Sequence, residues 1–224
     1  ADGAYLDGRH PAQVQFVPSL REDLARRDFT VNAMAMDLNG AVTDPFGGAD
    51  DLRCGVLRCV GVPERRFRED ALRMLRALRF SAQLGFSLEP ETARAVRRCA
   101  PLCAALSAER VRDEVEKALC SPQPERLEEM ATIGLLRPVG IERLPELRTL
   151  GALPEEPVLR WTGLLRLCPD VDSERLRLPA KAAQQMRRAA AAARSGLDTA
   201  ALKHCIADDG WQAAELAARL DGKQ

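Results

Sequence analysis

The chain has 224 residues, of which 46% are apolar, and its 33 basic side chains are balanced by 33 acidic ones. This length and composition allow one large or two small domains with a true hydrophobic core. The zero net charge excludes a protein that is basic throughout, so any surface for a polyanion must be local.

The seven cysteines contain no Cys-x-x-Cys pair, and nothing completes a zinc set beside Cys99 and Cys103. We therefore expect reduced thiols in a cytoplasmic protein. No apolar run has membrane-spanning length and no signal peptide is visible, so no membrane partner is expected. The chain begins at Ala1 in what reads as the middle of a domain, which predicts a piece of a longer protein.

Short strands and turns are predicted for the first 60 residues. Val14–Val17 is a strand candidate, and Asn39-Gly40 lies between apolar residues, which is a strong hairpin signal. A turn rich in Pro, Gly and carboxylates follows over Asp44–Leu52.

Fixed charges precede an apolar segment at Arg26, Arg27 and Asp28. We expect Phe29, Val31 and Ala33 to enter the core directly after them. Charges placed at the start of a buried segment cost free energy unless a partner or a ligand compensates them.

From residue 60 onward the pattern becomes helical. A helix is predicted over Phe67–Leu84 and ends at Gly85, a second covers Glu91–Arg98, and a third begins after Ser107 as its N-cap. Further helices are predicted over residues 122–135, 155–168, 174–195 and 198–219.

The predicted helix over Phe67–Leu84 carries two contrasting faces when it is drawn at 100° per residue. One face is apolar and the other is charged, and Phe80 falls within the charged arc, which indicates that this face also packs against something. The apolar face holds Phe67, Ala71, Met74, Leu75, Leu78 and Ala82, and the charged residues are Glu69, Asp70, Arg73, Arg76 and Arg79.

The charged face has two interpretations. One is a solvated helix surface with ion pairs such as Glu69–Arg73 and Asp70–Arg73. The other is a recognition face, in which a carboxylate accepts from an exocyclic amine while a guanidinium donates to a ring acceptor. Cytosine and adenine both offer an amino donor beside a ring acceptor, so an Asp/Arg pair could accept them and reject guanine and uracil.

Three motifs in this order resemble the class II tRNA nucleotidyltransferase and poly(A) polymerase family. They are RRDFTVNAMA from Arg26, DPFGGADDL from Asp44 and EDALRMLRALRF from Glu69, and the first 35 residues are similar to the bacterial CCA-adding branch. The resemblance covers residues 1 to about 135 well. It implies a mostly α, α+β fold, with a remnant of a nucleotidyltransferase β-sheet head at 1–60, a helical neck at 61–121 and a helical body at 122–224.

The resemblance also implies roles for particular residues. Arg27 and Asp28 match a motif that holds the ribose of the incoming nucleotide, and Asp70 and Arg73 match the pair that reads the base. Arg76 and Arg79 match further arginines of the nucleotide site that face phosphates. A third motif, implied to couple head and neck, comprises Asp44, Pro45, Phe46, Gly47, Gly48, Asp51 and Leu52.

The implied activity is template-independent addition of C, C and A to the 3′ end of tRNA from CTP and ATP, with Mg²⁺ as cofactor. The catalytic aspartates of the family lie upstream of this chain, so no catalytic or metal-binding residue is expected on it, and the chain alone should be inactive. Asp170-Val171-Asp172 has the letters of a metal motif, but capping of a following helix by Asp172 or Ser173 is the better interpretation.

Three functions remain open: a CCA-adding enzyme, a poly(A) polymerase or an enzyme that adds only CC or only A, and a non-catalytic RNA-binding module. The expected partners are the tRNA 3′ end and nucleoside triphosphates, contacted through local arginines and without a membrane. The oligomeric state is expected to be monomer or homodimer.

Overall fold

The computed structural model describes residues 19–196, 203 and 211–221. They fall into two compact units, Ala1–Cys103 and Ala104–Gln224, hereafter unit 1 and unit 2. The strand candidate Val14–Val17 lies outside the described residues. The finer division at residues 60 and 121 stays a prediction.

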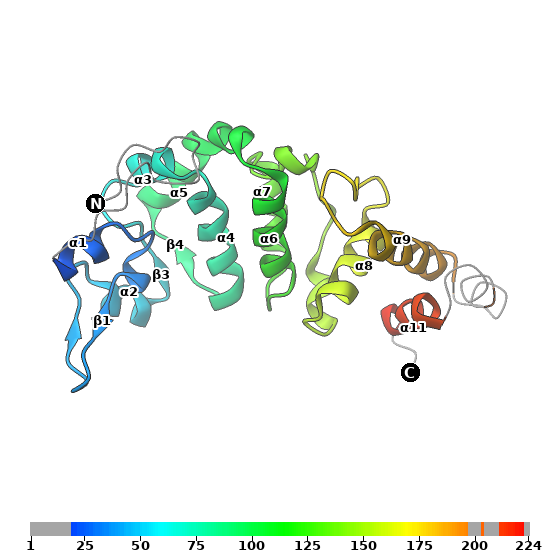
Figure 1. Ribbon diagram of the computed structural model, residues 1–224, viewed down its shortest axis with the longest axis horizontal. Helices are drawn as coiled ribbons and strands as arrows, with labels where there is room; N and C mark the ends of the chain where they lie inside the picture. Colours follow the sequence, from blue (N-terminus) through cyan, green and yellow to red (C-terminus); the bar gives the residue numbers. More distant parts are fainter. Residues whose placement is uncertain (1–18, 197–202, 204–210, 222–224) are drawn as a thin grey trace. The chain divides into compact units, whose positions relative to one another are not determined.

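Unit 1 combines short helices with two small sheets, and so confirms an α+β, mostly α fold (Figure 1). Apolar side chains such as Phe29, Leu57, Phe67 and Met74 are fully buried in it, as the sequence pattern requires of a core. Its elements are α1 (Leu20–Ala25), η1 (Thr30–Asn32), β1 (Ala35–Met36), β2 (Val42–Thr43), α2 (Gly48–Cys54), β3 (Val56–Leu57), α3 (Pro63–Glu69), α4 (Leu72–Leu84), β4 (Ser87–Leu88), α5 (Pro90–Cys99) and η2 (Ala100–Ala105), the last of which extends into unit 2.

The predicted hairpin is confirmed. Strands β1 and β2 pair antiparallel, and Gly40 in the connecting turn has φ of 85°, a conformation that glycine adopts without strain. The carboxylate of Asp37 accepts the N–H groups of Asn39 and Ala41, which closes the turn. In the second sheet β3 pairs parallel with β4, and an isolated bridge joins Phe29 to Cys59.

The predicted single helix over Phe67–Leu84 is wrong, because the structure divides it into α3 and α4. Asp70 has extended backbone angles, φ −151° and ψ 107°, and its carboxylate accepts the N–H of Leu72 at the start of α4. An aspartate that binds a free backbone N–H stabilises a helix start. The helix ends at Gly85 as predicted, with φ of 71°.

Helix α2 lies very close to η1, and Gly48 makes this approach possible. A Cβ atom added at Gly48 would lie 2.2 Å from the carbonyl oxygen of Thr30. Asp44 accepts the N–H groups of Gly48 and Ala49 at the start of the helix, and these hydrogen bonds, that of Ala49 above all, hold the pKa of its carboxyl below the usual range. The residues that follow Asp28 are therefore anchored against α2.

Unit 2 is helical among its described residues, and α8, α9 and α11 pack on one another. Arg160 on α8 is 1% exposed and donates to the carbonyl oxygens of Leu119, Ser121, Leu153 and Pro154 at 2.7–3.2 Å. The elements are α6 (Ala108–Leu119), α7 (Arg126–Thr132), η3 (Arg137–Val139), η4 (Arg148–Ala152), α8 (Pro157–Leu167), α9 (Ala180–Arg194) and α11 (Trp211–Leu220).

Three helices predicted in this half, over residues 122–135, 155–168 and 174–195, are present as α7, α8 and α9 but shorter. Most of the first half of the helix predicted over 198–219 lies outside the described residues, and α11 covers its end. Ser107 precedes α6 as expected, and α9 begins only at Ala180, after Pro179. Asp172 caps the turn before it, because its carboxylate accepts the N–H groups of Glu174 and Arg175. No helix of the described ranges is long and apolar enough to cross a membrane.

Candidate functional site

Two segments that are far apart in the sequence meet at an ion pair in unit 1. Arg76 of α4 reaches back to Asp28, which lies between α1 and η1, with Nη2 and Nε at 2.6 and 2.7 Å from Oδ2. The other carboxylate oxygen of Asp28 accepts the N–H of Phe29 and the side-chain amide of Asn32. The carboxylate is therefore buried, and both of its oxygens have partners. These contacts compensate the free energy that burial of the charge costs.

The side chain of Arg73 is held by a second network at the end of α3. Its Nη1 lies 2.9 Å from Oε2 of Glu69 and 3.1 Å from the carbonyl oxygen of Arg66, and its Nη2 donates to the carbonyl oxygen of Arg26 at 3.3 Å. The predicted Glu69–Arg73 ion pair is thus confirmed. It joins α3 and α4 across the break at Asp70.

Arg66 completes this network. Its Nη1 lies 2.6 Å from the same oxygen of Glu69, its Nε donates to the carbonyl oxygen of Val60, and its Nη2 donates to that of Ala25. Burial raises the pKa of Glu69, but the hydrogen bonds from Arg73 and Arg66 outweigh it and leave the pKa below the usual range. Arg66 is a residue of this region that its place in the sequence did not predict, because its backbone partners lie outside its own helix.

The remaining predicted residues occupy different environments. Arg27 is exposed and donates to the carbonyl oxygen of Asn32 at 3.2 Å and to Asp23 at 3.3 Å. Asp70 is half-buried at the junction of α3 and α4. Arg79 is only 7% exposed and donates to Gln83. A contact between Arg79 and a nucleotide therefore stays a prediction.

An aromatic ring lies beside two of the three arginines of α4. The guanidinium carbon of Arg79 lies 3.8 Å from the ring centroid of Phe80, and that of Arg76 lies 5.2 Å from it. The ring meets Phe29 edge to face, with centroids 5.9 Å apart and an interplanar angle of 83°. The expectation that this charged face also packs against something is confirmed.

Asp51 of the third motif, on α2, contacts the segment that follows Asp28. Asp51 accepts the hydroxyl of Thr30 at 2.7 Å and the Nε of Arg58 at 3.0 Å. It therefore ties α2 both to η1 and to the strand that leads into α3.

Val31 is half-buried, so of the three predicted core residues only Phe29 and Ala33 are fully buried.

The described residues do not form a metal site. Across residues 19–196, 203 and 211–221, no group of three His, Cys, Asp or Glu side chains could hold an ion. Two-metal phosphoryl transfer requires bridging carboxylates. The described part of the chain therefore does not fit the Mg²⁺ that the family implies.

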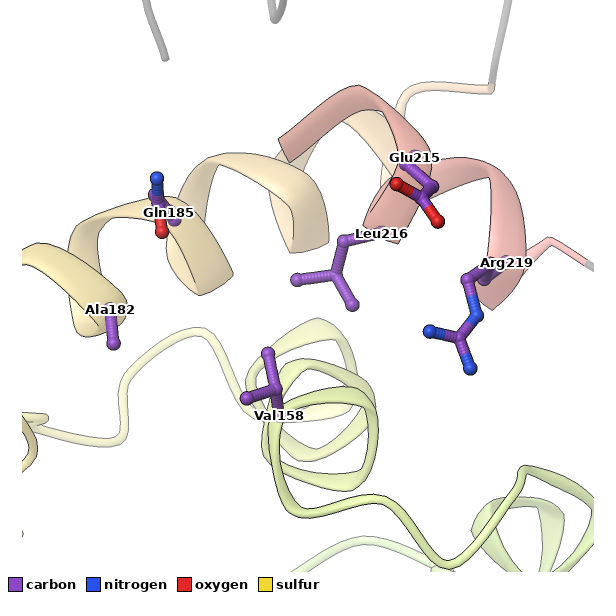
Figure 2. A pocket seen from close by; sticks show the side chains of 6 residues that line it. All are labelled: Val158, Ala182, Gln185, Glu215, Leu216 and Arg219. Carbon is purple, nitrogen blue, oxygen red and sulfur yellow. The ribbon is translucent and has the colours of Figure 1, made fainter. Parts of the chain in front are cut away.

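A separate hollow of about 290 Å³ lies in unit 2, between α8, α9 and α11. Figure 2 shows Val158 and Leu216 on facing sides of it, with Glu215 and Arg219 at its rim. Arg219 pairs with Glu156 at 2.7 Å. The hollow shares no residue with the ion pairs of unit 1.

Comparisons with known proteins identify two matching families, one within unit 1 and one that covers the end of unit 1 and the start of unit 2. Residues 1–58 match the family described as the poly A polymerase head domain, and residues 85–149 match that described as the probable RNA- and SrmB-binding site of polymerase A. The CCA-adding enzyme of Geobacillus stearothermophilus is 55% identical over 121 residues, which are 54% of this chain and 30% of the relative. That of Lactiplantibacillus plantarum is 49% identical over 156 residues, 68% of this chain and 38% of the relative.

Solved structures extend the similarity along the chain. The CCA-adding enzyme of Bacillus stearothermophilus, in complex with CTP, matches 93% of this chain and 56% of its own with a TM-score of 0.81 and 36% identity. The Thermotoga maritima CCA-adding enzyme complexed with tRNA shares the fold, at 22% identity and a TM-score of 0.58. The chain spans about a third of the length of the curated relatives that it matches.

Proposed function

The chain belongs to the class II tRNA nucleotidyltransferase and poly(A) polymerase family, and from this we propose that the protein it is part of adds C, C and A to the 3′ end of tRNA. The substrates would be CTP, ATP and a tRNA that lacks its terminal CCA. The observation that carries the proposal is that Arg73 and Arg76 of α4 meet the segment Arg26–Asp28, Arg73 at the carbonyl oxygen of Arg26 and Arg76 at the carboxylate of Asp28.

In the proposed site, Asp70 and Arg73 select the base. The carboxylate would accept the exocyclic amine of cytosine or adenine, and the guanidinium would donate to the neighbouring ring nitrogen. Guanine and uracil would leave the carboxylate and the guanidinium without hydrogen-bond partners. The free energy lost by burying unpaired polar groups is larger than the net gain from a single hydrogen bond, so these bases would be rejected. The hydrogen bonds of Arg73 to Glu69 and to two carbonyl oxygens support this role, because they hold the guanidinium in one orientation.

The sugar and phosphates would be held by the other predicted residues. Arg27 and Asp28 would contact the ribose, while Arg76 and Arg79 would face the triphosphate. The side chain of Arg76 is 33% exposed beside an almost buried Asp28, so its guanidinium can serve both a ligand and the ion pair. Arg79 would act from a buried position, with Phe80 and Gln83 as its neighbours.

The reaction itself would be attack of the tRNA 3′ hydroxyl on the α-phosphate, with release of pyrophosphate. Phosphoryl transfer of this kind requires carboxylates that hold metal ions, and no group of three potential ligands is found among the described residues, so no step is assigned to a metal held by them. We propose that the carboxylates that would hold Mg²⁺ lie outside the described residues. We further propose a cytoplasmic monomer or homodimer whose helices contact tRNA through phosphates.

The decisive test is nucleotide incorporation by the full-length protein. The RNA would be a tRNA without its CCA end, offered CTP alone, ATP alone and both together. Two C additions followed by one A would establish the proposal. Extension of unrelated RNA by ATP alone would make the protein a poly(A) polymerase, and binding of tRNA without any incorporation would make it an RNA-binding module.

A further inference from the structure

Phe80 is a half-buried aromatic residue on the charged side of α4, where a solvated helix would carry a polar side chain. Its ring lies among two guanidinium groups and one other aromatic ring. Arg79 contacts it at 3.8 Å and Arg76 at 5.2 Å, while Phe29 meets it edge to face. The ring therefore links α4 to the segment that follows Arg27 and Asp28.

The ring can restrain the guanidinium of Arg76. A cation within about 6 Å of an aromatic centroid is attracted by the ring quadrupole, more strongly where water is excluded. Arg76 is thus held by Asp28 through hydrogen bonds and by Phe80 through this attraction. The ring also lies close to Arg79, so it offsets part of the repulsion between two neighbouring positive charges.

The position of Phe80 is itself fixed by packing. Phe29 is fully buried, and its edge-to-face contact with Phe80 occurs at a geometry that aromatic pairs favour. Phe29 also follows Asp28 directly and donates its N–H to that carboxylate. One short segment therefore sets both partners of Arg76, the carboxylate and, through Phe29, the ring.

We propose that Phe80 is a positioning residue of the nucleotide site: its ring holds the Arg76 guanidinium against Asp28, and so sets the affinity for the sugar and triphosphate of the incoming nucleotide without affecting base choice. This inference rests on the proposed function. Base choice is separate, because Arg73 is held by Glu69 and by the carbonyl oxygens of Arg66 and Arg26, and none of these contacts involves the ring.

Three variants of the full-length protein test the proposal. Phe80→Leu removes the ring but keeps an apolar side chain, and Phe80→Tyr keeps the ring. Phe86→Leu is the matched control, since Phe86 is also half-buried in unit 1 and its ring packs near Gly55. The measurements are the Kd of CTP and of UTP by titration, the kcat and KM of CTP incorporation, and the melting temperature.

Phe80→Leu is expected to raise the Kd and KM of CTP about tenfold, by loss of a partly desolvated cation–π contact, with kcat changed by less than about twofold. The ratio of CTP to UTP affinity should stay the same. Phe80→Tyr should bind CTP like the wild type. Phe86→Leu should lower the melting temperature without changing the Kd, which separates loss of packing from loss of positioning.

The outcomes distinguish this inference from the function on which it rests. If the wild-type protein does not bind CTP, both fail. If it binds CTP and Phe80→Leu binds equally well, only the role of Phe80 fails. A Tyr variant as weak as the Leu variant, or a changed preference for CTP over UTP, would also overturn it, because the ring would then not act through Arg76.

Discussion

The ion pair between Asp28 and Arg76 should contribute measurably to the stability of unit 1, and a double-mutant cycle can test this. The perturbations are Asp28→Asn, Arg76→Gln and the two together. The side chain of Asp28 is 8% exposed and that of Arg76 is 33% exposed, with both donor nitrogens within 2.7 Å of one carboxylate oxygen. The pair is thus intermediate between a surface and a buried salt bridge.

The expected magnitude follows from this intermediate burial. Two unit charges about 4 Å apart attract by about 4 kcal/mol at an effective dielectric constant of about 20. Desolvation of the carboxylate offsets roughly half of that, which places the net coupling at about 2 kcal/mol, above the 0–1 kcal/mol of exposed pairs. Each single substitution should cost about 3 kcal/mol, because it leaves one charge without its partner, and the double substitution about 4 kcal/mol.

The assay must report on unit 1. Both tryptophans, Trp161 and Trp211, belong to unit 2, so their fluorescence does not serve. Hydrogen exchange of the α4 amides, together with circular dichroism in urea, reports the free energy of opening where the pair lies. The control cycle uses Arg53 and Asp50, an i,i+3 pair of α2 whose side chains are 74% and 73% exposed.

The control cycle should give a coupling below about 0.5 kcal/mol. A coupling for Asp28 and Arg76 that is no larger than that of the control would refute the reasoning. It would mean that the carboxylate is stabilised mainly by its hydrogen bonds to backbone and amide groups, and that Arg76 does not compensate its burial.

Four further predictions concern other parts of the chain. Arg160→Leu removes the buried guanidinium that donates to four carbonyl oxygens and should cost about 3–5 kcal/mol in unfolding free energy by tryptophan fluorescence in urea; a loss below about 1 kcal/mol would contradict this. Because Arg79 is buried and Arg76 is only half-buried, Arg79→Ala should weaken CTP binding less than Arg76→Ala does, and an unchanged Kd would remove Arg79 from the nucleotide site. Hydrogen bonds from two arginines hold the pKa of Glu69 below its unfolded value of about 4.5. The stability that Glu69 contributes is therefore present above that value and is lost as the pH falls through the lower folded pKa. Glu69→Gln should lose less stability on acidification than the wild type, and an unchanged acid profile would argue against this. Burial raises the pKa of Cys59 to about 12 while Cys54 is exposed, so iodoacetamide at about pH 8 should label Cys54 and spare Cys59 in peptide mass spectrometry, and equal labelling would contradict the burial.

Elements with strong local signals were predictable from the sequence. The Asn39-Gly40 turn, the helix end at Gly85 and the helix start after Ser107 each depend on one or two residues whose backbone preference acts locally. The break at Asp70 was missed for the opposite reason. Helical periodicity runs through it without Pro or Gly, and contacts beyond the local segment accompany the break, including the donation by Arg66 to the carbonyl oxygen of Ala25.

The proposed nucleotide site could be named from the sequence as a set of residues but not as a geometry. Three motifs in order identified the family, and with it the positions Arg27, Asp28, Asp70 and Arg73. The contacts of these residues could not be predicted from their spacing in the sequence. The hydrogen bond from Arg73 to the carbonyl oxygen of Arg26, for example, joins residues 47 positions apart. The burial of Arg79 has the same origin, since exposure depends on which elements pack over a residue.

The sequence by itself determined the family, the helical character of the chain and the residue types that its site offers, because these follow from motif order, hydrophobic period and side-chain chemistry. Tertiary structure alone decided that Asp28 pairs with Arg76, that Arg66 donates to the carbonyl oxygen of Ala25, and that the ring of Phe80 meets Phe29. The physical reason is that a buried charge takes whichever partner the packing of distant elements brings within hydrogen-bond reach, and that distance is set by the whole fold of unit 1.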